Sequence, residues 1–324
     1  MSTRHMVSAN MTRNIGMAII VGLLGASAVA CAEPRFNATF SGLADNENGR
    51  SLDVDTTLAA RNWLTLGAGL GSTSSRTASG SLDGTSVRLS ADVHSERFGV
   101  RGYYRNWSAN GMDSETFGVR PYFTYANLTL SIIGESRGLD VDYVTDASNP
   151  QRATAHYSGT GLGAGASYRW SYWNVYAEGV AYHYGALPRY VATSPAQTGN
   201  SSVPTPLTGM GLPTLPGPAG GVGSGLVQAL GYRVPALAGS YVTLKEGVFD
   251  HVLSAGVERG FARASLRIDW TGAKDAVLET DFNSFSASYR YMFTPRLTAG
   301  VTLGATESRY GSVNFGGLAF GITL

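Results

Sequence analysis

Hydrophobic residues recur at every second position through most of the chain, in short stretches separated by polar turns. The stretch 64–71 reads LTLGAGLG, 87–93 reads VRLSADV and 297–304 reads LTAGVTLG. A period of two is typical of β-strands, because successive side chains point to opposite faces. One face of these predicted strands is apolar and the other carries mostly Gly, Ser, Thr and Arg. We therefore expect an all-β fold whose two faces meet different environments.

The predicted connections between strands alternate between tight turns and longer polar links. Short turns at one end, longer loops at the other and an even strand number are typical of membrane barrels. Counting gives about fourteen strands, with twelve or sixteen as alternatives because 138–144 and 239–247 would extend or add strands. The tight turns fall near 61–62, 94–96, 126–127, 171–172, 259–260 and 294–295, and the links at 43–50, 72–84, 108–114, 137–151, 187–248, 271–281 and 306–314.

Hydropathy then decides between a soluble and a membrane fold. Beyond the N-terminus no segment has the roughly 20 unbroken apolar residues of a spanning helix, so a membrane segment must be a strand. The predicted fold is a transmembrane antiparallel up-and-down β-barrel whose apolar face meets lipid. Aromatic side chains near the predicted strand ends fit girdles at the two membrane interfaces. They are Trp63, Trp107, Tyr125, Trp170, Trp173, Trp270 and Phe293.

The N-terminus predicts a signal peptide. An apolar run at 15–26 is followed by Ala30-Cys31-Ala32, which fits the small-x-small cleavage rule. We expect cleavage after this motif, so that 1–32 is the signal peptide and 33–324 is a single barrel domain. A membrane anchor is the alternative, but the run is short for a spanning helix.

The final strand extends the alternation to the last residue. Leu318, Phe320, Ile322 and Leu324 alternate with smaller side chains. This pattern resembles the C-terminal assembly signal of bacterial outer-membrane β-barrel proteins of the porin-like class, although that signal usually ends in an aromatic residue rather than Leu. The resemblance implies a location in the bacterial outer membrane, contact with outer-membrane lipid and recognition by the barrel-insertion machinery through this strand.

Most charged side chains of the predicted strands fall on the face that would line the interior. Arg88, Arg101, Arg105 and Arg120 come from three consecutive strands and are expected to form a basic wall. Arginine suits planar contacts with carboxylate, phosphate or sulfate, which favours an anionic solute. The predicted pore-lining residues are Arg88, Arg101, Arg105, Arg120, Asp53, Asp55, Arg263, Arg267, Asp269 and Arg290.

The favoured function is a passive channel for small polar or anionic solutes, because rings of charged side chains set the preference of a pore. The first alternative is a structural or adhesive surface barrel whose lumen is filled by salt bridges. The second is a lipid-modifying enzyme, for which His156 on the lumen face, with Ser158 facing the same way, is the best candidate. The Pro- and Gly-rich loop 187–248 would narrow the pore, present a surface contact or be disordered.

Charge and motifs argue against other classes. A formal net charge of +1 does not suit a nucleic-acid partner. The glycines at 220–224 lie in a Pro-rich loop, without the strand and helix that a phosphate-binding loop needs. The histidines lack the spacing of metal ligands. We therefore predict no cofactor, no metal and no catalytic residues.

Overall fold

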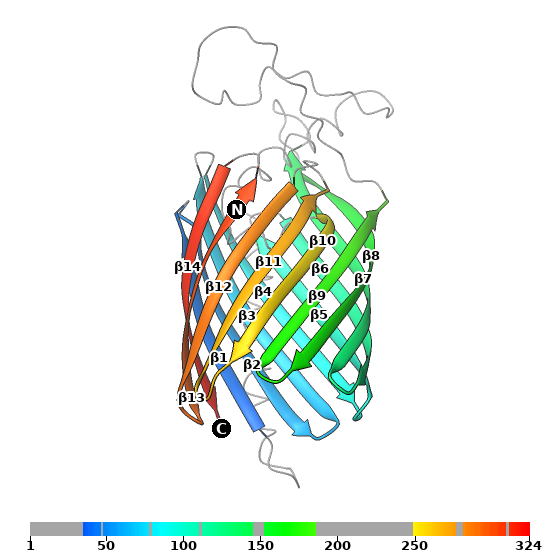
Figure 1. Ribbon diagram of the computed structural model, residues 1–324. Helices are drawn as coiled ribbons and strands as arrows, with labels where there is room; N and C mark the ends of the chain where they lie inside the picture. The colour runs from blue at the N-terminus through cyan, green and yellow to red at the C-terminus, as the bar shows by residue number, and fades with distance from the viewer. Residues whose placement is uncertain are drawn as a thin grey trace.

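Fourteen antiparallel strands form a closed barrel in the part of the chain that the computed structural model describes (Figure 1). The described residues are 35–46, 48–77, 80–109, 112–144, 152–185, 249–276, 281–308 and 311–324, so the predicted signal peptide and the loop 187–248 lie outside them. The strands are β1 (Arg35–Asp45), β2 (Arg50–Arg61), β3 (Leu64–Thr77), β4 (Gly80–His94), β5 (Phe98–Ala109), β6 (Met112–Tyr125), β7 (Leu128–Val144), β8 (Arg152–Trp170), β9 (Trp173–Tyr184), β10 (Phe249–Gly260), β11 (Ala264–Asp275), β12 (Asp281–Thr294), β13 (Leu297–Ser308) and β14 (Gly311–Thr323).

Each strand pairs with its neighbours in sequence, and β1 closes the barrel on β14. At this seam the amide of Phe36 donates to the carbonyl of Leu324 over 3.1 Å, and the amide of Leu324 donates to the carbonyl of Phe36 over 2.8 Å. Closure leaves no strand edge open to lipid, which a spanning sheet requires because lipid offers no hydrogen-bond partners. The predicted up-and-down barrel of about fourteen strands is confirmed.

The six predicted tight turns all join strands at the end of the barrel where β1 begins and β14 ends. Two of them are two-residue turns in which Ala126 and Ser171 adopt positive φ values of 50° and 51°. Such backbone angles match the right-handed twist of the two strands that a short hairpin joins.

Several longer links are shorter than predicted. Strands β3 and β4 continue through most of the predicted link 72–84, and the strands on either side of 108–114 and 306–314 do the same. The polar residues there still pair through their backbones, because ladder hydrogen bonds do not depend on apolar side chains. The strands at this end therefore extend beyond the stretch in which one face is apolar.

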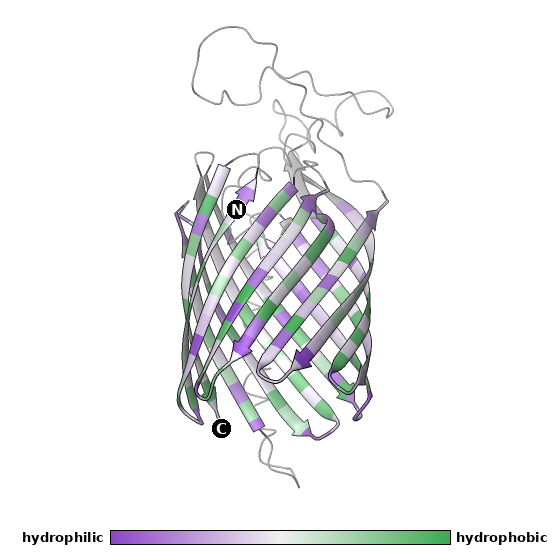
Figure 2. Cartoon of the chain, in the orientation of Figure 1, coloured by the Kyte–Doolittle hydropathy of each residue, from purple (hydrophilic) through white to green (hydrophobic). Residues whose placement is uncertain are grey.

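The outer wall carries an apolar belt, and hydrophobic and hydrophilic residues alternate along the strands (Figure 2). No helix among the described residues is long and apolar enough to cross a membrane. Trp107, which the sequence assigns to a girdle, instead lies on the lumen side of β5 and is 2% exposed. Exposed rings at the tight-turn end form the expected girdle, namely Trp63, Tyr125, Trp170, Tyr172, Phe261 and Phe293.

Candidate functional site in the barrel lumen

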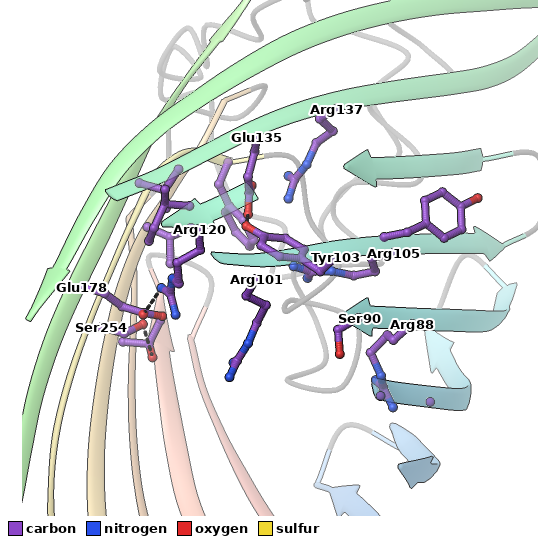
Figure 3. A pocket seen from close by; sticks show the side chains of 18 of the residues that line it. Arg88, Ser90, Arg101, Tyr103, Arg105, Arg120, Glu135, Arg137, Glu178 and Ser254 are labelled. Carbon is purple, nitrogen blue, oxygen red and sulfur yellow. Dashed lines mark hydrogen bonds and ion pairs between the residues drawn. The ribbon is translucent and has the colours of Figure 1, made fainter. Parts of the chain in front are cut away.

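A cavity of about 650 Å³ lies inside the barrel and is lined by residues of strands β2 to β7 and β9 to β13. Charged and hydroxyl side chains from these strands extend into it (Figure 3). Strand alternation explains this lining, because the apolar residues at the intervening positions point outward. Five of the predicted pore-lining residues border the cavity: Asp55, Arg88, Arg101, Arg105 and Arg120.

Three of the four arginines of the predicted basic wall form ion pairs. Arg88 Nη2 lies 2.9 Å from Asp53 Oδ1 and 3.2 Å from Asp55 Oδ1. Two nitrogens of Arg101 contact Asp92 Oδ2, with Nη2 at 2.7 Å and Nε at 3.1 Å. The third pair joins strands that are not neighbours, since Arg120 on β6 reaches Glu178 on β9. These ion pairs are partly buried, and they fix where each charge lies on the wall.

Arg105 differs from the other three arginines. It borders the cavity, lies directly across the ladder from Arg88 and has no ion pair or hydrogen bond to any side chain among the described residues. A guanidinium group carries five N–H donors in a planar fork. Arg105 therefore presents these donors to whatever occupies the cavity.

Tyrosines lie flat against the lumen wall where a neighbouring strand carries glycine. Tyr103 crosses Gly118, where a Cβ atom would lie 2.0 Å from the ring atom Cζ, and its hydroxyl donates to Glu135. Tyr182 lies over Gly161 in the same way. Its hydroxyl donates to Glu135 Oε2 over 2.6 Å, whereas Tyr103 donates to Oε1. These glycines thus leave the space in which the rings lie, and the lumen stays open.

Arg137 is a lumen residue that sequence reasoning missed. Its side chain is 8% exposed, its Nε donates to Thr116 over 3.3 Å, and its guanidinium lies 4.7 Å from the ring centroid of Tyr182. Arg137 falls at the start of the predicted link 137–151, but β7 continues to Val144. The inward alternation of Ile133, Glu135 and Arg137 was the signal that would have found it.

An apolar patch also borders the cavity, and it was not predicted from the sequence. It consists of Phe249, Ala273 and Phe282, from β10, β11 and β12, with Val252 and Tyr182 packed against them. All five residues border the cavity. The lumen wall therefore has an ionic part, on β2 to β7 and β9, and an apolar part, on β10 to β12.

The other predicted pore-lining residues lie outside the cavity lining. Asp53 meets Arg88 as described, and Arg267 pairs with Asp269 at 2.8 Å while donating to the hydroxyl of Tyr176 over 2.6 Å. Arg263 lies in the exposed turn before β11, and Arg290 is an exposed residue near the tight-turn end of β12. Their role in lining a pore stays a prediction.

His156 lies on the outer wall, not on the lumen face expected from the sequence. It alternates in phase with the outward Leu162, which is highly exposed, and its Nδ1 lies 2.5 Å from Asp140 Oδ1. Ser158 shares this outward face. Polar side chains are accommodated there because the strand end reaches beyond the apolar belt. The described residues contain no group of three His, Cys, Asp or Glu side chains arranged to hold a metal ion.

Comparisons with known proteins bear on the fold alone. No model of a known protein family matches the chain, and no curated protein matches its sequence. Solved structures with a similar fold include the CymD monoaromatic hydrocarbon channel (14% identity, TM-score 0.48, 90% of this chain and 87% of that chain covered) and a loop-deleted OmpT, an outer membrane protein of Vibrio cholerae (8%, 0.46, 90% and 98%). A third is the KdgM porin in complex with disordered oligogalacturonate (8%, 0.39, 88% and 98%).

The architecture of the chain agrees with its predicted location. The barrel is closed, has an even number of strands and carries an outer apolar belt. Its tight turns lie at the end where β1 begins and β14 ends. This is the architecture of bacterial outer-membrane β-barrel proteins. The chain is an outer-membrane β-barrel.

Proposed function

We propose that the protein is a passive channel for small polar or anionic solutes. The observation that carries this proposal is the cavity of about 650 Å³ inside a closed barrel, lined largely by charged and hydroxyl side chains. A lumen packed with salt bridges alone, as a structural barrel would have, leaves no such space. Solutes would cross by diffusion, since passage needs sites that bind weakly enough to release.

The charges around the cavity favour hydrated and ionic solutes over apolar ones. Arginines and carboxylates alternate along the wall, and most are paired with each other. Arg105, whose donors are free among the described side chains, is the group to which an anion would bind most readily. The charged residues of this wall are Arg88, Arg101, Arg105, Arg120, Arg137, Asp53, Asp55, Asp92, Glu135 and Glu178.

Recordings in planar lipid bilayers test this proposal. The refolded barrel is expected to give stepwise conductance, and replacing Arg88, Arg101, Arg105 and Arg120 with glutamine should shift the reversal potential in a KCl gradient toward cations. The shift is expected because the carboxylates that these arginines neutralise would remain.

A single substitution that removes a negative charge provides a second test in case the variant with four substitutions does not fold. Asp55→Asn removes one negative charge beside Arg88 and should move the reversal potential toward anions. A barrel that folds, shown by its heat-modifiable mobility in gels, but conducts no current contradicts the channel and favours a structural or adhesive role. Equal reversal potentials in all three proteins would remove the arginine wall from the mechanism.

A further inference from the structure

We propose that the cavity is a binding site for small amphipathic monocarboxylates, compounds with one carboxylate and one apolar group about the size of a phenyl ring. This inference rests on the proposed channel function and names its preferred class of solute. It follows from two unlike parts of the wall that border the same cavity: the guanidinium of Arg105, which has no ion pair or hydrogen bond to a side chain in the described part of the chain, and the apolar patch.

The apolar patch is an unusual feature for a passage that serves hydrophilic solutes alone. Phe249 and Phe282 are 8% and 5% exposed and form a packed base, over which the partly buried Val252 and Tyr182 present apolar surface to the cavity. Apolar surface in contact with water is unfavourable by about 25 cal/mol per Å². A solute that covers the patch with an apolar group removes that cost, whereas a hydrated ion does not.

The two parts of the wall are joined by one side chain. Tyr182 packs against the apolar patch and also lies within the electrostatic reach of Arg105. The hydroxyl of Tyr182 donates a hydrogen bond to Glu135, and the Arg137 guanidinium lies 4.7 Å from the centroid of the Tyr182 ring. The two parts of the wall therefore meet at one tyrosine, so a solute that contacts both would carry its carboxylate and its apolar group close together.

The charges near Arg105 favour a monoanion over a dianion. Its cross-strand neighbour Arg88 already holds Asp53 and Asp55, whose negative charges would repel a second charge on the solute. A guanidinium group donates two parallel hydrogen bonds to one carboxylate. A doubly charged phosphate would find no further free arginine side chain among those that border the cavity, since Arg88, Arg101, Arg120 and Arg137 all have partners.

The cavity has the right size for such a compound. Its volume of about 650 Å³ falls within the range of about 300–1,000 Å³ that is usual for small-molecule sites. A phenyl ring and a short acid chain fill part of it and leave room for water, as a transient site in a channel requires.

Block of the single-channel current by three probes tests the site. The probes are 3-phenylpropanoate, propanoate, which lacks the ring, and 3-phenylpropan-1-ol, which lacks the charge. We expect 3-phenylpropanoate to reach half-maximal block at a concentration about tenfold lower than either of the others, because each part of the molecule contributes roughly a factor of ten.

Variants assign each part of the solute to a part of the wall. Arg105→Gln should raise the half-blocking concentration of 3-phenylpropanoate about tenfold and leave that of the alcohol unchanged. Val252→Thr keeps the side-chain volume but adds a hydroxyl to the apolar patch, and it should weaken both ring-containing probes. Arg169→Gln, which removes an exposed arginine at the tight-turn end of β8, is the matched control for loss of a positive charge.

The outcomes separate this inference from the channel itself. Equal block by all three probes, or an equal effect of the Arg105 and Arg169 variants, overturns the site while the channel stands. If the folded barrel carries no current, the channel fails. Isothermal titration calorimetry of the refolded barrel with 3-phenylpropanoate then decides the site by itself: heat that disappears in Arg105→Gln supports it, and no heat in the unaltered protein overturns it.

Discussion

Gly118→Val is expected to destabilise the barrel by about 3 kcal/mol, since overpacking costs ~1–3 kcal/mol and a hydrogen bond to a carboxylate contributes ~1.5–3 kcal/mol. A Cβ atom at Gly118 would lie 2.0 Å from Cζ of Tyr103, so the ring must leave the wall and lose its bond to Glu135. The displaced ring would stand in the lumen, so conductance should fall together with stability.

Urea unfolding of the barrel in lipid vesicles, with single-channel conductance as a second measurement, checks this result. Gly102→Val is the matched control, because a Cβ atom at Gly102 meets nothing within 4 Å and the position faces lipid on β5. If the two valine variants lose the same stability and conduct alike, the close fit between Tyr103 and Gly118 does not matter.

Ile132→Arg is expected to destabilise the barrel by about 2–4 kcal/mol, the usual cost of a charged side chain near the middle of the lipid face. Ile132 lies outward on β7, is 60% exposed in the isolated barrel and sits between the apolar Leu130 and the polar Ser136. The lower stability of the Ile132→Arg variant should be measurable by urea unfolding of the barrel in lipid vesicles.

Ser136→Arg supplies the depth control for this substitution. It places the same side chain on the same face of β7 near the edge of the apolar belt, where the cost falls to about 0–1 kcal/mol. Comparable losses for the two arginine variants would mean that the outer wall does not face a hydrocarbon layer.

The sequence predicted the barrel well because the alternation is repeated in every strand. Within 64–74 of β3 and 297–306 of β13, for example, each outward residue is apolar or small and each inward residue is small or polar, so the sequence shows which face of the strand points outward. A repeated pattern of period two, bounded by tight turns, needs no knowledge of distant contacts.

The site was less predictable because its contacts depend on register and on local irregularities. The partners of Arg88 lie 35 and 33 residues earlier in the chain, at distances that the sequence does not encode. Phe249 has the parity of the outward His251, but a register shift between the two turns it toward the lumen. A β-bulge of this kind re-aims a side chain and has no reliable sequence signal.

His156 shows that a polar residue type does not always mean that the side chain faces the lumen. The outward positions of β8 change from Trp170, Tyr168 and Leu162 to Ser158 and His156 along the strand. A polar residue indicates the lumen within the apolar belt, whereas beyond the belt both faces of the strand meet water. The sequence alone does not mark where that change occurs.

The seam between the first and last strands makes the order of events during biogenesis important. Nine residues of β1, Asn37–Asp45, find their partners in Phe315–Thr323 of β14. Until those last residues are in place, both β1 and β13 offer a bare row of amides and carbonyls, which invites pairing with other chains. A polypeptide that is truncated before this strand is therefore an aggregation hazard rather than a slightly smaller pore, and the whole chain must be protected until its final residues arrive.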